Sequence, residues 1–347
     1  MRGDGEAGSP RCPAKGDCVK VESAVVIGLG SMGRRRIRLL KSFAEAPRIV
    51  GVNRNGERRA EAARELGIAA YATLDEAMVD ASPQVALVCT APHLHGPTVL
   101  DCLRRGLDVF MELNLVGDWY PEAMETARRL GRKLFVAATP VYRREMRYIA
   151  EKVAGDTVNY IFHCGQYLPD WHPWQDYHEF FAARKETNGC REILAVEMPW
   201  IEKAFGRVKS VHVMSGRNTK LDIDFPDHYM ISIVHENGNK GMYCQDVVSR
   251  KAVRRLEVFS ENHHIFWEGT PDSLREYDFA SKALVPVRLY DDVVQDGRYS
   301  ANIIENAYAD ELRAFLDFVQ DGKEPAYRFE DDVHTLAVVD EIEGIKR

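Results

Sequence analysis

The stretch Ala24-Val25-Val26-Ile27-Gly28-Leu29-Gly30-Ser31-Met32-Gly33 decides the fold of this chain. Its apolar first part predicts a buried parallel strand. The basic segment 34–43 that follows carries apolar residues at helical spacing. Strand, glycine turn and helix in this order are typical of a dinucleotide-binding unit. The alternative is an ordinary glycine turn. Because both flanks fit, we favour the cofactor interpretation.

Each glycine of this turn has its own physical role. Gly28 permits the tight turn, and Gly30, which has no Cβ, lets a pyrophosphate approach the backbone. Gly33 lets the helix pack closely against the strand. The unpaired N–H groups at the start of the helix then attract the phosphates. We therefore expect the whole turn to contact the cofactor: Gly28, Leu29, Gly30, Ser31, Met32 and Gly33.

The end of the second predicted strand, 48–53, bears on the choice of cofactor. An NAD-binding unit places an acidic residue about 20 residues beyond the glycine turn, where it holds the ribose 2′-hydroxyl. This chain has Asn53 and Arg54 there, with Arg58 and Arg59 close behind. Guanidinium groups suit a 2′-phosphate, so the pattern favours NADP, with NAD as the alternative. The arginines could equally form a solvated helix face.

Composition excludes several classes of protein. The 347 residues are enough for two domains. The net charge of −7, without a long basic block, argues against a nucleic-acid partner. No apolar run approaches the roughly 20 residues that span a bilayer, and no signal-peptide core is present, so we expect a cytoplasmic protein and no membrane partner. The seven cysteines show no zinc spacing, which predicts reduced thiols and no metal.

The order of predicted elements divides the chain. We expect 1–22 to be a disordered extension, and strands alternating with helices make 23–142 a doubly wound parallel sheet. Residues 143–347 show alternating stretches with few helices before 290, which predicts an α+β domain with an open, mostly antiparallel sheet. Its C-terminal helices, 302–320 and 331–345, are expected to pack back.

Ligands of a doubly wound sheet gather at the carboxyl ends of its strands. Besides Gly28 and Asn53, those ends carry the following residues: Thr90, Ala91, Pro92, Glu112, Ala138 and Thr139.

Three further segments carry a resemblance. After the glycine turn come CTAPHLHGP (89–97), VFMEL (109–113) and VAATP (136–140). In this order they resemble the Gfo/Idh/MocA family, the group of glucose–fructose oxidoreductase and inositol dehydrogenase, over about 23–347. The resemblance implies a Rossmann domain that binds NAD(P), with His95 and Glu112 in the family's histidine and glutamate positions. It also implies a homodimer or homotetramer formed through the C-terminal sheet.

The chain departs from the family where the chemistry is expected. The family's Glu-Lys-Pro is Glu112-Leu113-Asn114 here, so its acid–base lysine is replaced by a leucine. Its catalytic histidine falls on Val196, with the aspartate partner near Glu192 or Ile193. Glu192 and Glu197 remain in that region. A half-buried carboxylate can act as a base, but both could equally be first-turn helix acids.

The loop 166–178, QYLPDWHPWQDYH, has the composition of a sugar site, because aromatic faces and polar groups suit sugar rings and hydroxyls. The alternative is a loop packed over the sheet. We expect the substrate proton to pass to His172, Asp176 or Glu197. The expected substrate-binding residues are Tyr142, Trp171, Trp174, Lys185 and Arg191.

These features predict an NAD(P)-dependent oxidoreductase that transfers hydride to or from a sugar, cyclitol or nucleotide-sugar. One alternative is an NAD-dependent glycosidase that works by transient oxidation and elimination. Another is a non-catalytic protein that binds a nucleotide or sugar, which loss of the lysine and histidine would fit.

Overall fold

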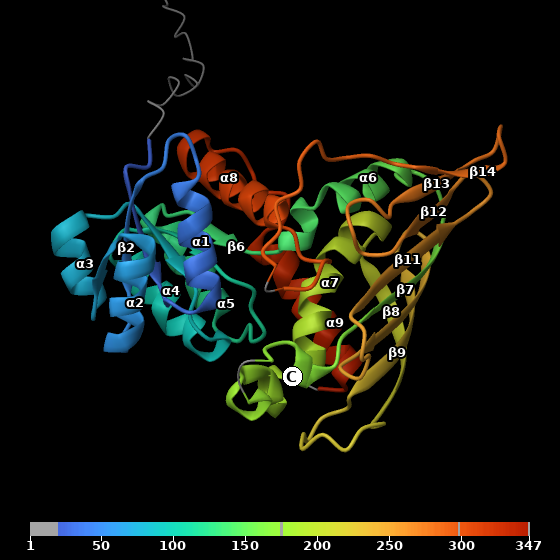
Figure 1. Cartoon of the computed structure of the whole chain (residues 1–347), viewed down its shortest axis with the longest axis horizontal. Coiled ribbons are helices and arrows are strands. Elements are labelled where there is room, and N and C mark those ends of the chain that lie inside the picture. The colour runs from blue at the N-terminus through green and yellow to red at the C-terminus, as the bar shows by residue number, and fades with distance from the viewer. Residues whose placement is uncertain (1–19, 174–175, 298, 346–347) are drawn as a thin grey trace, which may run out of the picture.

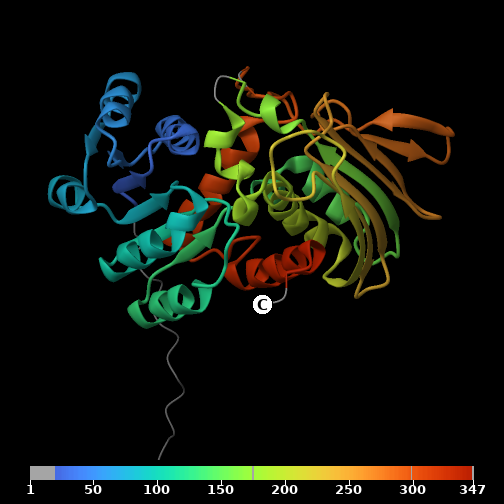
Figure 2. The same ribbon diagram turned by 90° about the horizontal axis from the view of Figure 1, so that it is seen from below.

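The computed structural model describes residues 20–173, 176–297 and 299–345, and the predicted N-terminal extension therefore falls almost entirely outside it. Two sheets lie at opposite sides of the molecule, with helices of the C-terminal half between them (Figure 1; Figure 2). This is the α/β architecture that the sequence predicts.

The first sheet is six-stranded and parallel, with the order β3-β2-β1-β4-β5-β6. Its strands are β1 Ser23–Ile27, β2 Arg48–Val52, β3 Ala69–Tyr71, β4 Val85–Val88, β5 Asp108–Met111 and β6 Leu134–Val136. The helices between them are α1 Ser31–Lys41, α2 Gly56–Leu66, α3 Leu74–Ala81, α4 His95–Arg104 and α5 Tyr120–Leu130. Every residue of β1 and β4 is buried, as expected for central strands covered on both faces.

The second sheet is eight-stranded, with the order β14-β13-β12-β11-β7-β10-β9-β8. Its strands are β7 Asn159–Gly165, β8 Val208–Gly216, β9 His228–His235, β10 Lys240–Asp246, β11 Val253–Phe259, β12 His264–Trp267, β13 Arg275–Asp278 and β14 Ala283–Pro286. The pair β7–β10 is parallel and the other pairs are antiparallel, so the predicted, mostly antiparallel sheet is confirmed. Side chains of β7, β9 and β10 alternate between buried and exposed, because helices cover only one face.

The remaining helices join the two sheets. They are α6 Arg144–Lys152, α7 Gly189–Phe205, α8 Glu305–Asp321 and α9 Phe329–Glu343. Helix α7 contacts β9 and β10 on the covered face, α9 contacts α7 and β6, and α8 returns to α1. Short 3-10 turns complete the described chain: η1 Pro92–Leu94, η2 Thr139–Tyr142, η3 Leu168–Asp170, η4 Tyr177–Glu179, η5 Phe181–Ala183 and η6 Lys185–Thr187.

Some element bounds differ from those predicted. Helix α1 begins at Ser31 rather than residue 34, so its first turn lies inside the glycine motif. Helix α8 begins at Glu305 instead of 302, and α9 covers Phe329–Glu343 instead of 331–345. The hairpin β13–β14 was not predicted from the sequence, because its strands have only four residues each, none of them buried, and lack an apolar alternation. None of the helices in the described ranges combines the length and apolar character needed to cross a membrane.

Candidate active site

The glycine turn has the geometry that a nucleotide cradle requires. Gly28 has φ +98°, and a Cβ there would lie 2.4 Å from the Cys89 carbonyl oxygen. A Cβ on Gly33 would lie 1.9 Å from the Gly28 carbonyl oxygen. A Cβ on Gly30, by contrast, would meet no atom within 4 Å, so the space beside this residue is open. The two outer glycines therefore shape the turn, while Gly30 leaves its backbone accessible to a ligand.

The surroundings of this turn suit an anionic group. The first turn of α1 contains no acidic residue. A hollow beside it is lined by Gly30, Ser31, Arg34, Arg58 and Tyr299, among others. Tyr299 lies across the turn, with its hydroxyl 2.5 Å from Ser31 Oγ. Unpaired helix N–H groups with arginines nearby fit the diphosphate of NAD(P).

Of the polar side chains that follow β2, those of Asn53 and Arg59 stabilise the turn. Asn53 Oδ1 accepts a hydrogen bond from the Asn55 amide at 2.9 Å, and the Arg59 guanidinium donates to the carbonyl oxygens of Asn53 and Arg54. The Arg54 and Arg58 side chains have no hydrogen bond or ion pair within the described parts of the chain. Arg58, unlike Asn53, Arg54 and Arg59, lines the hollow beside Gly30. It is therefore the arginine best placed to meet a phosphate there.

Thr90 and His95 lie at the next strand end. His95 is buried, with Nε2 2.9 Å from the Thr90 carbonyl oxygen and Nδ1 3.3 Å from Asn114 Oδ1. Burial lowers the pKa of His95, which favours the neutral ring. The imidazole thus connects the loops after β4 and β5. The Thr90 hydroxyl is buried and has no partner among the described residues, so it is available to a ligand at this edge.

Glu112, at the end of β5, belongs to a buried charge cluster with Arg36 and Glu311. Arg36 Nε donates to Glu112 Oε1 at 2.5 Å, and its Nη2 donates to Glu311 Oε2 at 2.7 Å. Glu311 also accepts hydrogen bonds from the Ala138 amide at 2.7 Å and the Thr139 hydroxyl at 2.9 Å. This cluster fixes α1, β5, β6 and α8 relative to one another. Neither Arg36 nor Glu311 stands out in the sequence as a site residue.

A cavity of about 310 Å³ opens between the carboxyl edge of the first sheet and helix α7. The first domain contributes Met32, Glu112, Leu113 and the segment Ala137–Pro140. The C-terminal half contributes the remaining lining: Arg143, Trp171, Glu192, Ile193, Val196, Glu197, Arg254, Asn302, Ile303, Ile304, Ala307 and Tyr308. Leu113 and Val196, where the resembled family has lysine and histidine, both line it.

Glu192 is the distinctive ionisable group of this cavity. It lies in the first turn of α7, which begins after Asn188, whose side chain accepts a hydrogen bond from the Arg191 amide at 2.7 Å. Its Oε2 is buried and lacks a hydrogen-bond partner among the described residues. Burial raises the pKa of Glu192 to about 8 from the ordinary 4.5. The carboxyl is therefore mostly protonated at neutral pH and is suited to exchanging a proton with a ligand.

Glu197 also lines the cavity, but its oxygens have partners. Oε1 pairs with Arg254, and Oε2 accepts a hydrogen bond from Trp200 Nε1 at 2.6 Å. Burial lowers the pKa of Arg254, but the adjacent Glu197 raises it more, so Arg254 stays charged. One sequence signal could have revealed Arg254: it occupies the inward position of β11 that Leu256 and Val258 continue.

The loop 166–178 approaches the cavity through Trp171, whose Nε1 donates to the Gln166 carbonyl oxygen at 2.9 Å. His172 is half-buried and packs against Phe180 outside the cavity lining, and burial lowers its pKa. Asp176 is exposed, caps the turn η4 and pairs with His178 at 2.6 Å. Trp174 lies outside the described residues.

The other predicted substrate ligands do not line this cavity. Tyr142 is buried and stacks on Phe135, and Lys185 is exposed. Arg191 is buried and joins α7 to α9, through Asp340 at 2.7 Å and through Glu343, while its Nε donates to the Leu115 carbonyl oxygen. The structure thus brings together Trp171, Glu192 and Glu197. Outside the lining of this cavity lie Tyr142, Lys185 and Arg191.

Comparison with known families bears on the first domain. Residues 23–137 match the profile described as an oxidoreductase family with an NAD-binding Rossmann fold. Over this third of the chain the sequence is therefore similar to the NAD-binding domain of the Gfo/Idh/MocA oxidoreductases. The resemblance identified from the glycine turn and the three later segments is thereby confirmed. The glycine turn lies within the part of the chain that matches the NAD-binding Rossmann fold.

Solved structures extend the comparison to the whole chain. GenD2 from gentamicin A biosynthesis, in complex with NAD, has 18% identity and a TM-score of 0.72, with 96% of each chain covered. UDP-N-acetylglucosamine 3-dehydrogenase GnnA from Acidithiobacillus ferrooxidans has 15% identity and a TM-score of 0.75, with 93% of this chain and 96% of that chain covered. Myo-inositol 2-dehydrogenase from Lactobacillus plantarum has 15% identity and a TM-score of 0.75, with coverages of 94% and 97%. At these identities the likeness shows a shared fold. A search of curated proteins found no match.

Proposed function

We propose that this chain is an NAD(P)-dependent oxidoreductase of a carbohydrate-type alcohol or ketone, with Glu192 as its acid–base residue. One observation carries the proposal. Glu192 presents a buried carboxyl oxygen without a partner to a cavity that adjoins the carboxyl edge of the Rossmann sheet. Ligands of such sheets bind at this edge.

The cavity residues have distinct roles in this mechanism. When bound in the cradle, NAD(P) supplies or accepts the hydride. Glu192, protonated at neutral pH, donates a proton to the carbonyl oxygen during reduction, and its carboxylate accepts the hydroxyl proton during oxidation. Leu113, Ile193 and Val196 provide the apolar lining of the same cavity. In this role Glu192 replaces His172, Asp176 and Glu197, the candidates taken from the sequence.

The substrate class rests on the polar and aromatic groups around Glu192. Trp171 offers a flat indole face, and Asn302 lies on the lining with the paired cations Arg143 and Arg254. An aromatic face beside a few fixed polar groups suits a ring that carries hydroxyls. The dehydrogenases named above that act on inositol and on UDP-N-acetylglucosamine share the fold, which supports the same class here.

Turnover on a panel of substrates tests this function. The intact chain is mixed with NADPH or NADH and a panel of keto-sugars, and with the oxidised cofactors and a panel of cyclitols and nucleotide-sugars. Nicotinamide absorbance is followed in each mixture. Oxidation or reduction of at least one member supports the proposal. Cofactor binding without turnover of any member would contradict it and would favour a non-catalytic binding protein.

Arg58 is expected to set the preference for NADP. Arg58→Glu should weaken NADPH binding about tenfold to a hundredfold, because a charge-assisted contact to the 2′-phosphate is lost and a repulsive charge replaces it. NADH, which lacks this phosphate, should bind within about threefold of its original affinity. Fluorescence titration with both nucleotides measures the change.

The matched control is Arg64→Glu, which reverses a charge on the same helix away from the hollow. Equal losses of NADPH affinity in the two variants would mean that only net charge matters. A stronger response of the original chain to NADH than to NADPH would overturn the preference for NADP.

We further propose that two copies of the chain pair through the open face of the second sheet. The outer face of β7–β10 exposes a group of large apolar side chains: Ile161, Met214, Met230, Val234 and Met242. Large apolar side chains gathered on one sheet face are typical of an interaction surface, so a covering surface is expected. The helices of the C-terminal half all lie on the other face (Figure 1).

A double substitution tests this pairing. Met230→Glu combined with Met242→Glu should convert a dimer or tetramer to smaller species in sedimentation velocity, because it buries charge in the apolar contact. Val79→Glu, at an exposed position on α3, serves as the control and should leave the assembly unchanged. A monomeric original chain would contradict the proposal.

A further inference from the structure

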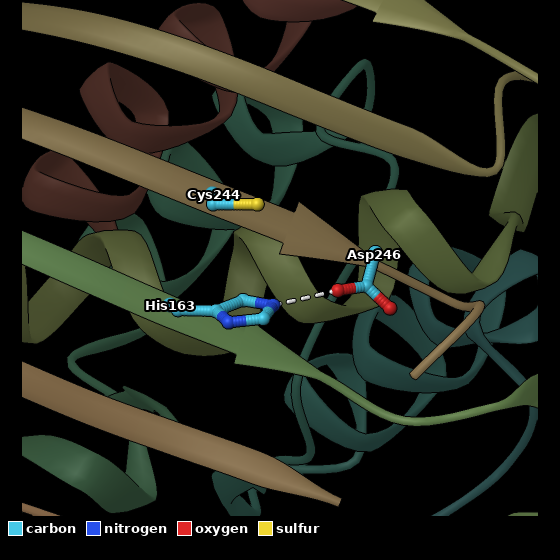
Figure 3. A group of neighbouring side chains, drawn as sticks. All are labelled: His163, Cys244 and Asp246. Carbon is cyan, nitrogen blue, oxygen red and sulfur yellow. Dashed lines mark hydrogen bonds and ion pairs between the residues drawn. The ribbon is translucent and has the colours of Figure 1, made fainter. Parts of the chain in front are cut away.

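A second cluster of chemical groups lies on the open face of the second sheet, away from the cavity. His163, Cys244 and Asp246 each offer one ligand atom, and these atoms all lie within 4.8 Å of one another (Figure 3). His163 comes from β7, and Cys244 and Asp246 come from the adjacent strand β10. The sequence alone does not reveal this site. His163 and Cys244 are separated by 80 residues and come together only because β7 pairs with β10.

Strand register brings these side chains together. Cys244 pairs with His163 in the parallel ladder, and Asp246, two residues further along β10, shares the same face. Asp246 is paired with Gly165, where a Cβ would lie 2.4 Å from Asp246 Oδ2. The glycine therefore leaves the space that the carboxylate occupies. A side chain at residue 165 would push the carboxylate away from His163.

The carboxylate is held in place before any ion binds. Asp246 Oδ1 accepts hydrogen bonds from the amides of Val248 at 2.8 Å and Ser249 at 2.6 Å. Its Oδ2 accepts one from the Ser249 hydroxyl at 2.9 Å and lies 2.7 Å from His163 Nε2. Such outer contacts are what fixes the orientation of ligands in metal sites.

We propose that His163, Cys244 and Asp246 form a zinc site whose fourth position is taken by a further ligand. Imidazole, thiolate and carboxylate are the side chains that zinc selects, and tetrahedral zinc separates its ligand atoms by roughly 3.3–3.7 Å. The present separations, from 2.7 Å to within 4.8 Å, need only a small side-chain adjustment to reach that range. The thiolate and carboxylate together neutralise the dication.

The ion would join β7 to β10, the parallel pair of the sheet, and it would lie beside the exposed methionines of the same face. Met230 is the register partner of Cys244 on β9. The site is therefore separate from the oxidoreductase cavity, and it does not depend on the function proposed for that cavity.

Cobalt substitution and zinc competition test the site. The intact, reduced chain is titrated with Co²⁺, and one equivalent per chain should give a thiolate-to-cobalt charge-transfer band. Zinc should abolish that band by displacement, and Zn²⁺ competition with a chromophoric chelator gives the affinity. Cys244→Ser should remove the band, and His163→Ala should weaken zinc binding at least about tenfold.

His212→Ala is the matched control, because this histidine is exposed on β8 of the same sheet and lies outside the cluster. It should leave zinc affinity unchanged. A cobalt band that persists in Cys244→Ser would overturn the proposal, since another thiol would then be the ligand. Absence of stoichiometric zinc binding to the intact chain, or equal losses in His163→Ala and His212→Ala, would also overturn it.

Discussion

Replacing Glu192 with glutamine is expected to lower kcat by about 10²–10⁴-fold, the range that a positioned acid–base residue contributes. Glutamine keeps the shape of the side chain but cannot exchange a proton. The carboxyl has a pKa raised to about 8 by burial, so the original chain should reduce ketones with a rate that falls above about pH 8. Oxidation should instead accelerate as pH rises toward that value, and both limbs should vanish in Glu192→Gln. Steady-state rates across pH measure these profiles.

Stability against pH separates this role from a structural one. Because the folded pKa of Glu192 lies above its ordinary 4.5, the folded chain binds more protons than the unfolded chain between about pH 4.5 and 8. This group therefore makes stability fall as pH rises through that window. Glu192→Gln should remove this dependence and keep or improve stability at pH 9. A variant that unfolds, or that retains full turnover with the same pH profile, would contradict the assignment.

Arg36→Met is expected to cost about 3–5 kcal/mol of folding free energy, because it leaves buried carboxylates without their cation. Arg36 is fully buried, and its two ion pairs tie Glu112 and Glu311 to helix α1. Burial raises the pKa of Glu311 even with the arginine present, and the adjacent Arg36 opposes this rise. The deficit in the variant should therefore shrink at acid pH, where the carboxyl can be protonated. Urea unfolding at pH 5 and pH 8 measures both effects.

Arg34→Met provides the matched control on the same helix. Arg34 also has two acidic partners, Glu61 at 2.5 Å and Glu65 at 2.7 Å, but those carboxylates are about half exposed. Exposed pairs contribute at most about 1 kcal/mol, so this variant should be only slightly destabilised. Equal losses in the two variants would show that burial of the cluster does not determine its contribution.

The sequence was most informative where structure is local. The glycine turn and the alternating strands and helices each depend on neighbouring residues, and both appear as predicted. The role of Asn53 was less clear from the sequence, because the same side chain can contact a ribose or stabilise a turn. In the structure it accepts a hydrogen bond from the Asn55 amide.

The candidate site depends on contacts that no local pattern encodes. Arg36 meets Glu311 across 275 residues, and Arg191 meets α9 across about 150, so neither pairing can be read from spacing. The sequence suggested that Arg191 binds the substrate. In the structure its guanidinium instead pairs with Asp340 and Glu343 of α9. Glu192 was one of two equivalent helix acids in the sequence. Only the packing of α7 distinguishes them, because it gives partners to both oxygens of Glu197 and leaves one oxygen of Glu192 without any.

Fluorescence titration of the intact chain with NADPH tests the central claim most directly, with Gly30→Asp as the comparison. The space beside Gly30 is open, so aspartate should be accommodated in the fold while its charge repels a pyrophosphate at the helix N-terminus. The account predicts saturable binding of one NADPH per chain that Gly30→Asp abolishes without loss of folded structure. Absence of NADPH and NADH binding to the original chain, or unchanged binding in Gly30→Asp, would contradict it.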